Sequence, residues 1–189
     1  MQPAVLVVGG FGLPPQIYGR LTRDLDAHLA PTGFTIGCGE VEARKVQRIV
    51  EELDEPVALV GHSRGGQLAR VVAARASGRV RMLVSVGTPT SIGPPQRWGV
   101  PLVASAMRAL RLPFALDCAT GACCRDFRAD LAGPVVVPWT AIWSPVDRIV
   151  PPNESRHNDA RLQEVRASHV GLVTTERGRA AIASALNRA

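Results

Sequence analysis

The chain has 189 residues, 46% of them hydrophobic, which predicts one globular domain with a substantial core. Its net charge is +6, but only 4% of its residues are aromatic, and its arginines alternate with acidic residues. Nucleic-acid binding favours a dense basic stripe with interleaved aromatic residues, so this composition argues against a nucleic-acid partner.

No apolar run approaches the roughly 20 residues that a membrane-spanning helix needs, so we expect no stable membrane insertion. Residues 1–3 lead directly into a strand-like run, without the basic segment and apolar core of a signal peptide. We therefore expect a cytoplasmic protein, with a mature secreted form as the alternative.

The first half of the chain alternates between strand and helix patterns. Residues 4–8 are wholly apolar, as in a strand that is covered on both faces. In chain order we expect a strand at 4–8, a helix at 17–29, a short strand at 34–37, a helix at 41–53, a strand at 57–60 and a helix at 67–76.

The second half begins with a predicted strand at 79–86 and ends with a strand at 135–143 and a helix at 175–187. Between them, residues 90–131 are too many for a simple connection. We expect them to form a small cap-like insertion within a single domain that spans residues 1–189. One ordinary packing helix with irregular flanks is the alternative.

Strands that alternate with helices predict a three-layer α/β fold, in which helices cover both faces of a mostly parallel sheet. In such sheets, reacting groups lie beyond the carboxyl ends of the strands. Three candidate segments follow predicted strands: residues 9–12, the turn at Ser63 and the residues after Trp143.

The turn is Gly61-His62-Ser63-Arg64-Gly65, between a predicted strand and a predicted helix. A Gly-x-Ser-x-Gly sequence in that context is typical of a nucleophile elbow, which holds a serine in a strained conformation with its hydroxyl exposed. Its glycines avoid collisions with neighbouring backbone. Ser63 is therefore the candidate nucleophile, and an ordinary glycine-rich turn is the alternative.

A serine nucleophile needs a base, and the chain has four histidines. We expect His28 within a helix, His62 pointing away from the serine, and His157 in a solvated polar loop. His169 lies in a short loop before the last helix and is the candidate base; a structural histidine is the alternative.

A carboxylate must accept a hydrogen bond from the far imidazole nitrogen of the base. Asp147 follows the predicted strand that ends at Trp143 and is the candidate, with a surface ion pair to Arg148 as the alternative. Asp126 and Asp130 lie within the insertion and lack a strand to position them.

An oxyanion that forms beside the serine needs amide donors. We expect the backbone N–H groups of Phe11 and Arg64 to supply them. Candidates for lining an acyl pocket, each with a plain core position as its alternative, are Phe11, Trp98, Met107, Phe114 and Trp143.

The four cysteines do not predict a metal site. Cys118, Cys123 and Cys124 crowd one loop, whereas Cys38 stands alone. The spacing lacks paired Cys-x-x-Cys clusters, and no histidine stands beside it. We expect reduced thiols, with a Cys118–Cys123 or Cys118–Cys124 disulfide as the alternative, and neither a metal nor an organic cofactor.

Five segments and one residue order carry a family resemblance. The segments are residues 8–12, 61–66, 87–89, 144–151 and 168–169, and the order is Ser63, Asp147, His169. In these segments and in this order, the chain resembles small α/β-hydrolases of the bacterial lipase and esterase kind. The resemblance implies the three-layer α/β-hydrolase fold and a Ser-His-Asp triad.

The chain departs from the lipase pattern in two places. Lipases often have His-Gly where this chain has Gly9-Gly10, and a histidine where it has Thr90. The chain also begins at the strand that carries the oxyanion loop, which implies a minimal sheet without the family's first antiparallel strands.

The resemblance implies hydrolysis of small-molecule carboxylic esters through an acyl-enzyme on Ser63. A thioesterase or acyltransferase with the same triad is the first alternative, and a non-catalytic binding module of this fold is the second. The acyl chain length, the leaving group and the oligomeric state stay open.

Overall fold

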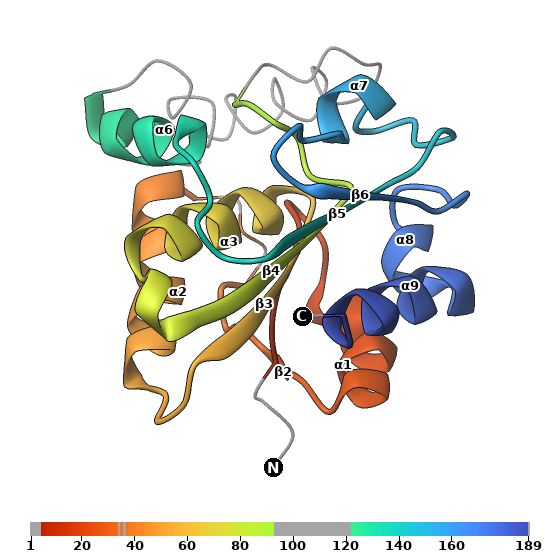
Figure 1. Ribbon diagram of the computed structural model, residues 1–189, viewed down its shortest axis with the longest axis horizontal. Helices are drawn as coiled ribbons and strands as arrows, with labels where there is room; N and C mark the ends of the chain where they lie inside the picture. The colour runs from red at the N-terminus through yellow and green to blue at the C-terminus, as the bar shows by residue number, and fades with distance from the viewer. Residues whose placement is uncertain (1–4, 34, 36, 93–121, 189) are drawn as a thin grey trace.

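A parallel sheet forms the centre of the structure. The computed structural model describes residues 5–33, 35, 37–92 and 122–188 (Figure 1). The described strands are β1 (Val5–Val8), β2 (His28–Leu29), β3 (Val57–His62), β4 (Val80–Val86), β5 (Trp139–Trp143) and β6 (Arg161–Glu164). Their order is β2-β1-β3-β4-β5-β6, and each described pairing is parallel, which confirms the predicted sheet.

Helices cover both faces of this sheet. The described helices are η1 (Pro15–Tyr18), α1 (Gly19–Leu25), α2 (Gly39–Glu52), α3 (Arg64–Arg75), η2 (Ser77–Arg79), η3 (Ala122–Cys124), α6 (Arg125–Ala132), α7 (Pro152–Ser155), α8 (Gly171–Thr174) and α9 (Glu176–Leu186). Figure 1 shows α2, α3 and α6 on one side and α1, α8 and α9 on the other. The predicted three-layer α/β architecture is therefore confirmed.

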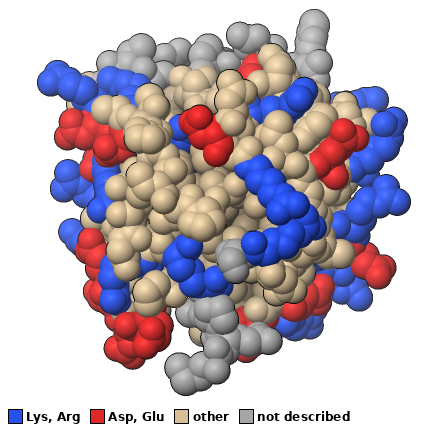
Figure 2. Space-filling model, in the orientation of Figure 1, with Lys and Arg blue, Asp and Glu red and all other residues tan. Residues whose placement is uncertain are grey.

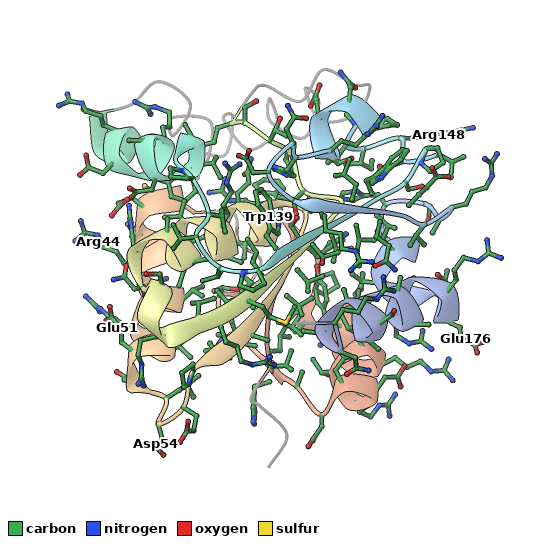
Figure 3. All side chains as sticks on the ribbon, viewed as in Figure 1. Arg44, Glu51, Asp54, Trp139, Arg148 and Glu176 are labelled. Atoms are coloured by element: carbon green, nitrogen blue, oxygen red, sulfur yellow. The ribbon has the colours of Figure 1, made fainter. Side chains whose placement is uncertain are left out.

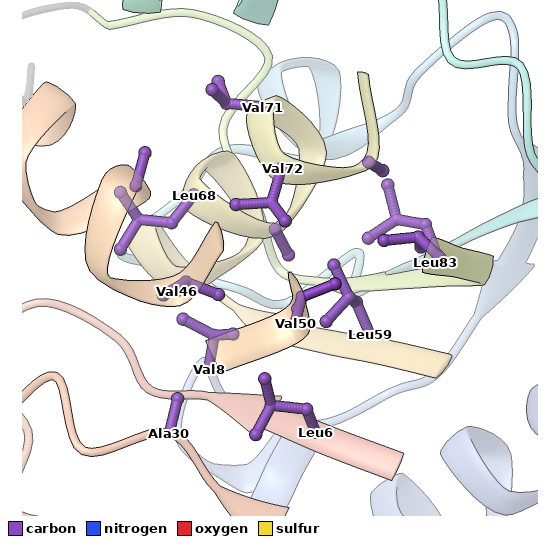
Figure 4. Close-up of a cluster of buried hydrophobic side chains, with 14 of the residues drawn as sticks. Leu6, Val8, Ala30, Val46, Val50, Leu59, Leu68, Val71, Val72 and Leu83 are labelled. Atoms are coloured by element: carbon purple, nitrogen blue, oxygen red, sulfur yellow. The ribbon is translucent and has the colours of Figure 1, made fainter. Parts of the chain in front are cut away.

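Successive residues of the central strands point into two separate cores. In β3, Leu59 belongs to the core beneath α2 and α3, whereas Val60 belongs to the core beneath α1, α8 and α9. Figure 4 shows the first core, to which α2 contributes Val50 and α3 contributes Leu68. Because both faces are covered, a one-residue shift in register would exchange the two cores, so the register is fixed by burial.

Most predicted elements are confirmed. The predicted strands at 4–8, 57–60 and 79–86 correspond to β1, β3 and β4. The predicted helices at 41–53, 67–76 and 175–187 correspond to α2, α3 and α9. The strand predicted at 135–143 begins only at Trp139, because Pro138 before it has no N–H to donate to a ladder.

The prediction of a helix at 17–29 is wrong in its second half. Asp26 adopts the left-handed conformation, with φ 48° and ψ 46°, and ends α1. The N–H of Ala27 then bonds to the carbonyl of Thr22, as in a Schellman C-cap. The chain continues into β2, so His28 lies exposed in a strand and not within a helix.

The prediction of a strand at 34–37 is wrong for the described residues there. The second strand along the chain is β2 instead. Neither Thr35, with φ 48°, nor Gly37 lies in a strand. The sequence analysis did not predict β6. This strand lies at the edge of the sheet and is largely exposed, so it lacks the apolar pattern of a buried strand.

Residues 93–121 of the predicted insertion lie outside the described residues, and with them Trp98, Met107 and Phe114. The cap-like form of the insertion stays a prediction. Its last part forms α6, which packs Phe127 into the core beside α2 and α3.

Among the described residues, no helix combines the length and the apolar character that crossing a bilayer requires. Figure 2 shows basic and acidic side chains interspersed over one face.

His157 is buried, so the prediction that it lies in a solvated loop is wrong. Its Nδ1 lies 3.3 Å from Nη1 of Arg70, and its Nε2 lies 3.2 Å from the carbonyl oxygen of Thr88. Because a guanidinium only donates and a carbonyl only accepts, His157 is neutral with its proton on Nε2. The ring also contacts Trp139, labelled in Figure 3, with 4.6 Å between ring centroids.

This burial makes stability depend on pH. Desolvation, reinforced by the Arg70 guanidinium, lowers the pKa of His157 to about 4, whereas an unfolded histidine has a pKa of about 6.5. Below pH 6.5 the unfolded chain therefore binds a proton that the folded protein excludes, and stability falls as the pH falls toward 4. For this group, we expect a loss of about 2 kcal/mol between pH 7 and pH 5.

Urea unfolding at the two pH values measures this loss. In His157→Gln, whose amide can replace both hydrogen bonds, the drop between pH 7 and pH 5 should shrink by about that amount. His28→Gln, at an exposed position, is the matched control and should leave the drop unchanged. An equal drop in both variants and the native protein would contradict the prediction.

Candidate active site

The loops that the sequence singled out meet at the carboxyl edge of the sheet, where parallel strands end together. β1 leads into Gly10 and Phe11, β3 leads into Ser63, and β5 leads into the loop of Asp147. His169 lies just before α8. The structure therefore brings these four segments of the sequence to one end of the fold.

Ser63 forms a sharp turn between β3 and α3. Its φ is 53° and its ψ is −126°, a strained conformation for a residue with a side chain. Its N–H donates to the carbonyl of Val86 over 2.8 Å, which fixes the turn to the end of β4. The residue is half-exposed, in agreement with the geometry expected of a nucleophile elbow.

Glycines make this turn sterically possible. A Cβ on Gly65 would lie 2.2 Å from the carbonyl oxygen of Val8, and one on Gly61 would lie 2.4 Å from Cα of Gly66. A Cβ on Gly66 would lie 1.9 Å from Oγ1 of Thr88. The first turn of α3 therefore packs directly against the backbone of β1 and the loop after β4.

Asp147 and His169 form a buried pair. Nδ1 of His169 lies 2.7 Å from Oδ2 of Asp147, and the two side chains are 7% and 0% exposed. Oδ1 of Asp147 accepts hydrogen bonds from the N–H groups of Ile149 and Val150, over 2.8 and 3.0 Å. Arg148 instead lies at the periphery of the molecule (Figure 3).

Ser144 and Gly87 hold this pair in place; the sequence analysis named them only within the segments 144–151 and 87–89. Oγ of Ser144, buried at the end of β5, donates to the carbonyl of Ala167 over 2.6 Å and so joins the loops of Asp147 and His169. Gly87, with φ 54°, lets both side chains approach, since a Cβ there would lie 3.3 Å from Nδ1 of His169.

A series of buried hydrogen bonds links the loop after β1 to the loop of His169. The N–H of Gly10 donates to the hydroxyl of Tyr18 over 2.6 Å, and that hydroxyl lies 2.9 Å from Nδ1 of His62. Nε2 of His62 lies 3.1 Å from the carbonyl oxygen of His169. Since that carbonyl only accepts, His62 carries its proton on Nε2 and accepts at Nδ1 from the tyrosine.

Burial keeps the side chains of His62 and Tyr18 uncharged. Desolvation, together with the neighbouring His169, lowers the pKa of His62 to about 3, and desolvation raises the pKa of Tyr18 to about 12. No pattern in the sequence pointed to Tyr18, because its partner lies 44 residues away.

The proposed amide donors flank Ser63. A Cβ on Gly10 would lie 3.1 Å from Cβ of Ser63, so the loop that carries Phe11 passes close beside the serine. Arg64 begins α3, where the first amides have no partner within the helix. Its guanidinium is buried and donates to the carbonyl of Gly37 over 2.7 Å.

Of the predicted pocket residues, Phe11 and Trp143 are described, and both are half-exposed. The guanidinium of Arg156 lies over the ring of Trp143, 4.8 Å from its centroid. Among the described residues, no group of three or more His, Cys, Asp or Glu side chains could hold a metal ion.

The packing at Gly65 predicts that a single methyl group disrupts the site. Gly65→Ala should lower the stability by more than about 4 kcal/mol or prevent folding, because the carbonyls of Val8 and Gly9 cannot both move away. Gly78→Ala is the matched control, since a Cβ there meets nothing within 4 Å, and should change stability by less than about 1 kcal/mol. Urea unfolding compares the two variants; equal effects would contradict the prediction.

Tyr18→Phe tests the series of buried hydrogen bonds. The variant leaves the N–H of Gly10 and Nδ1 of His62 without their partner while keeping the aromatic ring. We expect a loss of about 2 kcal/mol in the free energy of unfolding, measured by urea denaturation. A variant as stable as the native protein would show that neither bond contributes.

Comparisons with known proteins support the assignment of the fold. A family model described as alpha/beta hydrolase fold matches residues 43–117, which include β3, Ser63 and α3. No curated protein matches the sequence significantly.

Solved structures match almost the whole chain. The enol-lactonase from Burkholderia xenovorans has a TM-score of 0.68 and 16% identity, covering 98% of this chain and 92% of its own. The thioesterase domain from the curacin biosynthetic pathway has a TM-score of 0.67 and 14% identity, covering 99% and 91%. The monoacylglycerol lipase from Paleococcus ferrophilus has a TM-score of 0.63 and 17% identity, covering 98% and 95%. The fold that the sequence resemblance implies is confirmed, and the chain is identified as a protein with the α/β-hydrolase fold.

Proposed function

We propose that the protein is a serine hydrolase that cleaves small-molecule carboxylic esters through an acyl-enzyme on Ser63. The observation that carries the proposal is the buried Asp147–His169 pair, 2.7 Å apart, beside the elbow. The carbonyl of His169 contacts His62, the residue before the strained Ser63. A nucleophile, a base and an orienting carboxylate are the three groups that this chemistry needs.

Each of the three groups has its own role in the proposed mechanism. His169 accepts the proton of the Ser63 hydroxyl through Nε2 as Oγ attacks the ester carbonyl carbon. Asp147 accepts from Nδ1–H, which fixes the tautomer and stabilises the imidazolium that forms. His169 then gives the proton to the departing alkoxide, and water activated by the same imidazole releases the acyl group.

The tetrahedral intermediates carry a negative oxygen that needs donors. The backbone N–H groups of Phe11 and Arg64 fill this role in the proposal, because their loops flank Ser63. The guanidinium of Arg64 donates to the carbonyl of Gly37. This bond fixes the side chain of the residue whose backbone N–H is a proposed donor. Besides water, the proposed mechanism uses only groups of the chain and requires no cofactor.

The acyl group is proposed to contact Phe11 and Trp143, both half-exposed beside the loops of the site. Trp98, Met107 and Phe114 complete the proposed pocket and belong to the predicted insertion. A thioesterase or acyltransferase is the second candidate, favoured by the similarity to a thioesterase domain with a TM-score of 0.67. A binding module without activity is the third.

Ser63→Ala tests the assignment. Turnover of short p-nitrophenyl esters should fall at least about 10³-fold, because the hydroxyl that forms the acyl-enzyme is lost. Ser77→Ala, at an exposed serine in η2, is the matched control and should keep full activity. Circular dichroism checks that both variants fold. Turnover that persists in Ser63→Ala would exclude the mechanism.

The native protein and Ser63→Ala also distinguish the alternative functions. A fluorophosphonate probe should label the native protein at Ser63 and leave Ser63→Ala unlabelled, whereas a binding module would take no label. Comparison of matched ester and thioester substrates, with and without added alcohol, distinguishes ester hydrolysis from thioester hydrolysis and from acyl transfer. A higher kcat/KM for the thioester would favour the second candidate.

A further inference from the structure

Cys38 stands apart from the other cysteines in the sequence, but the fold brings it against one of them. Sγ of Cys38 lies 3.2 Å from Sγ of Cys124, and the two residues are 86 positions apart. A disulfide has an S–S distance of about 2.05 Å, so the contact is non-covalent but close to bonding range. We propose that Cys38 and Cys124 form a reversible disulfide by exchange with a low-molecular-weight disulfide.

The two sulfur atoms lie at a junction between helices. Cys38 is the N-cap of α2, and Cys124 is the N-cap of α6. Next to them, a Cβ on Gly39 would lie 3.0 Å from the ring of Phe127, so the beginning of α2 packs directly on α6. This close approach holds the thiols together without a covalent bond between them.

An ion-pair bridge fixes the same helices further along. Arg75 of α3 pairs with Glu40 of α2 over 2.8 Å and with Asp130 of α6 over 2.7 Å. Glu40 and Asp130 lie within two turns of Cys38 and Cys124, so the contact between the sulfur atoms belongs to a packed interface. A cross-link there needs only a small further approach of the two side chains.

The exposure of the two side chains determines which thiol reacts first. Cys38 is partly exposed, whereas Cys124 is buried. The thiolate of Cys38 attacks one sulfur of the small disulfide, which releases one thiol and leaves a mixed disulfide. The thiolate of Cys124 then attacks the Cys38 sulfur and releases the second thiol. Two protein thiols are oxidised and one small disulfide is reduced to two thiols, so electrons and protons balance.

The cross-link would enclose the elbow in a covalent loop. Residues 38 and 124 flank β3, Ser63 and β4 in the sequence. Gly37, beside Cys38, accepts the hydrogen bond from the Arg64 guanidinium. Oxidation therefore ties α6 to the segment that anchors Arg64, and it restricts the unfolded chain more than a short-range bridge does. The proposal does not depend on the proposed hydrolase activity.

Oxidised glutathione is the probe, and a variant with Cys118→Ser and Cys123→Ser isolates the pair. Only two of the four cysteines then remain. After alkylation of residual thiols, trypsin leaves them in peptides 24–44 and 112–125, so one linked species identifies the bond by mass spectrometry. We expect these two peptides linked, reversal by dithiothreitol, and a Tm higher by roughly 5 °C in the oxidised form.

Cys38→Ser or Cys124→Ser, added to that variant, should abolish both the linked peptides and the Tm shift. The native protein, with bonds assigned by fragment spectra, is the second measurement and should show the same linkage. Glutathione adducts without a linked peptide, unreacted thiols in the folded protein, or a bridge that joins Cys118 to Cys123 or Cys124 would each overturn the proposal.

Discussion

The structure depends on the absence of side chains where α3 begins. Gly65 lies against the carbonyls of Val8 and Gly9, and Gly61 lies against Gly66, at distances that leave no room for a Cβ. This contact of backbone with backbone sets the position of the first turn of α3 relative to β1 and β3. It also sustains the strained conformation of Ser63, because the surrounding elements determine where the chain must turn.

Two buried neutral histidines join separate segments of the structure. His62 joins Tyr18 to the backbone of His169, and His157 joins Arg70 of α3 to the carbonyl of Thr88. In each ring one nitrogen donates and the other accepts, so each side chain satisfies two loops at once. Burial keeps both rings uncharged, so neither histidine forms an ion pair.

Local patterns predicted the sharp turn at Ser63 and the strands that lead into the candidate loops, because a glycine-rich turn and the end of an apolar strand are each recognised from a few neighbouring residues. Contacts between distant segments were not predictable in that way. Ser144 and Cys38 find partners 23 and 86 residues away. The burial of His157 was not predicted, because its neighbours in the sequence are polar. The helix end at Asp26 was not predicted, because a left-handed helix end is uncommon without glycine. The chemical roles of Ser63, Asp147 and His169 stay proposals.

The two edges of the sheet have a consequence for how the molecule behaves among its copies. An edge strand with unpaired backbone groups is a template for another chain. Among the described residues, the edge strands are β2, with 2 residues, and β6, which carries Arg161 and Glu164 at its ends. A further strand would find little backbone to pair with at β2 and fixed charges at β6. The sheet is therefore built to resist growth by strand addition, and with it the aggregation that a longer, apolar edge would invite.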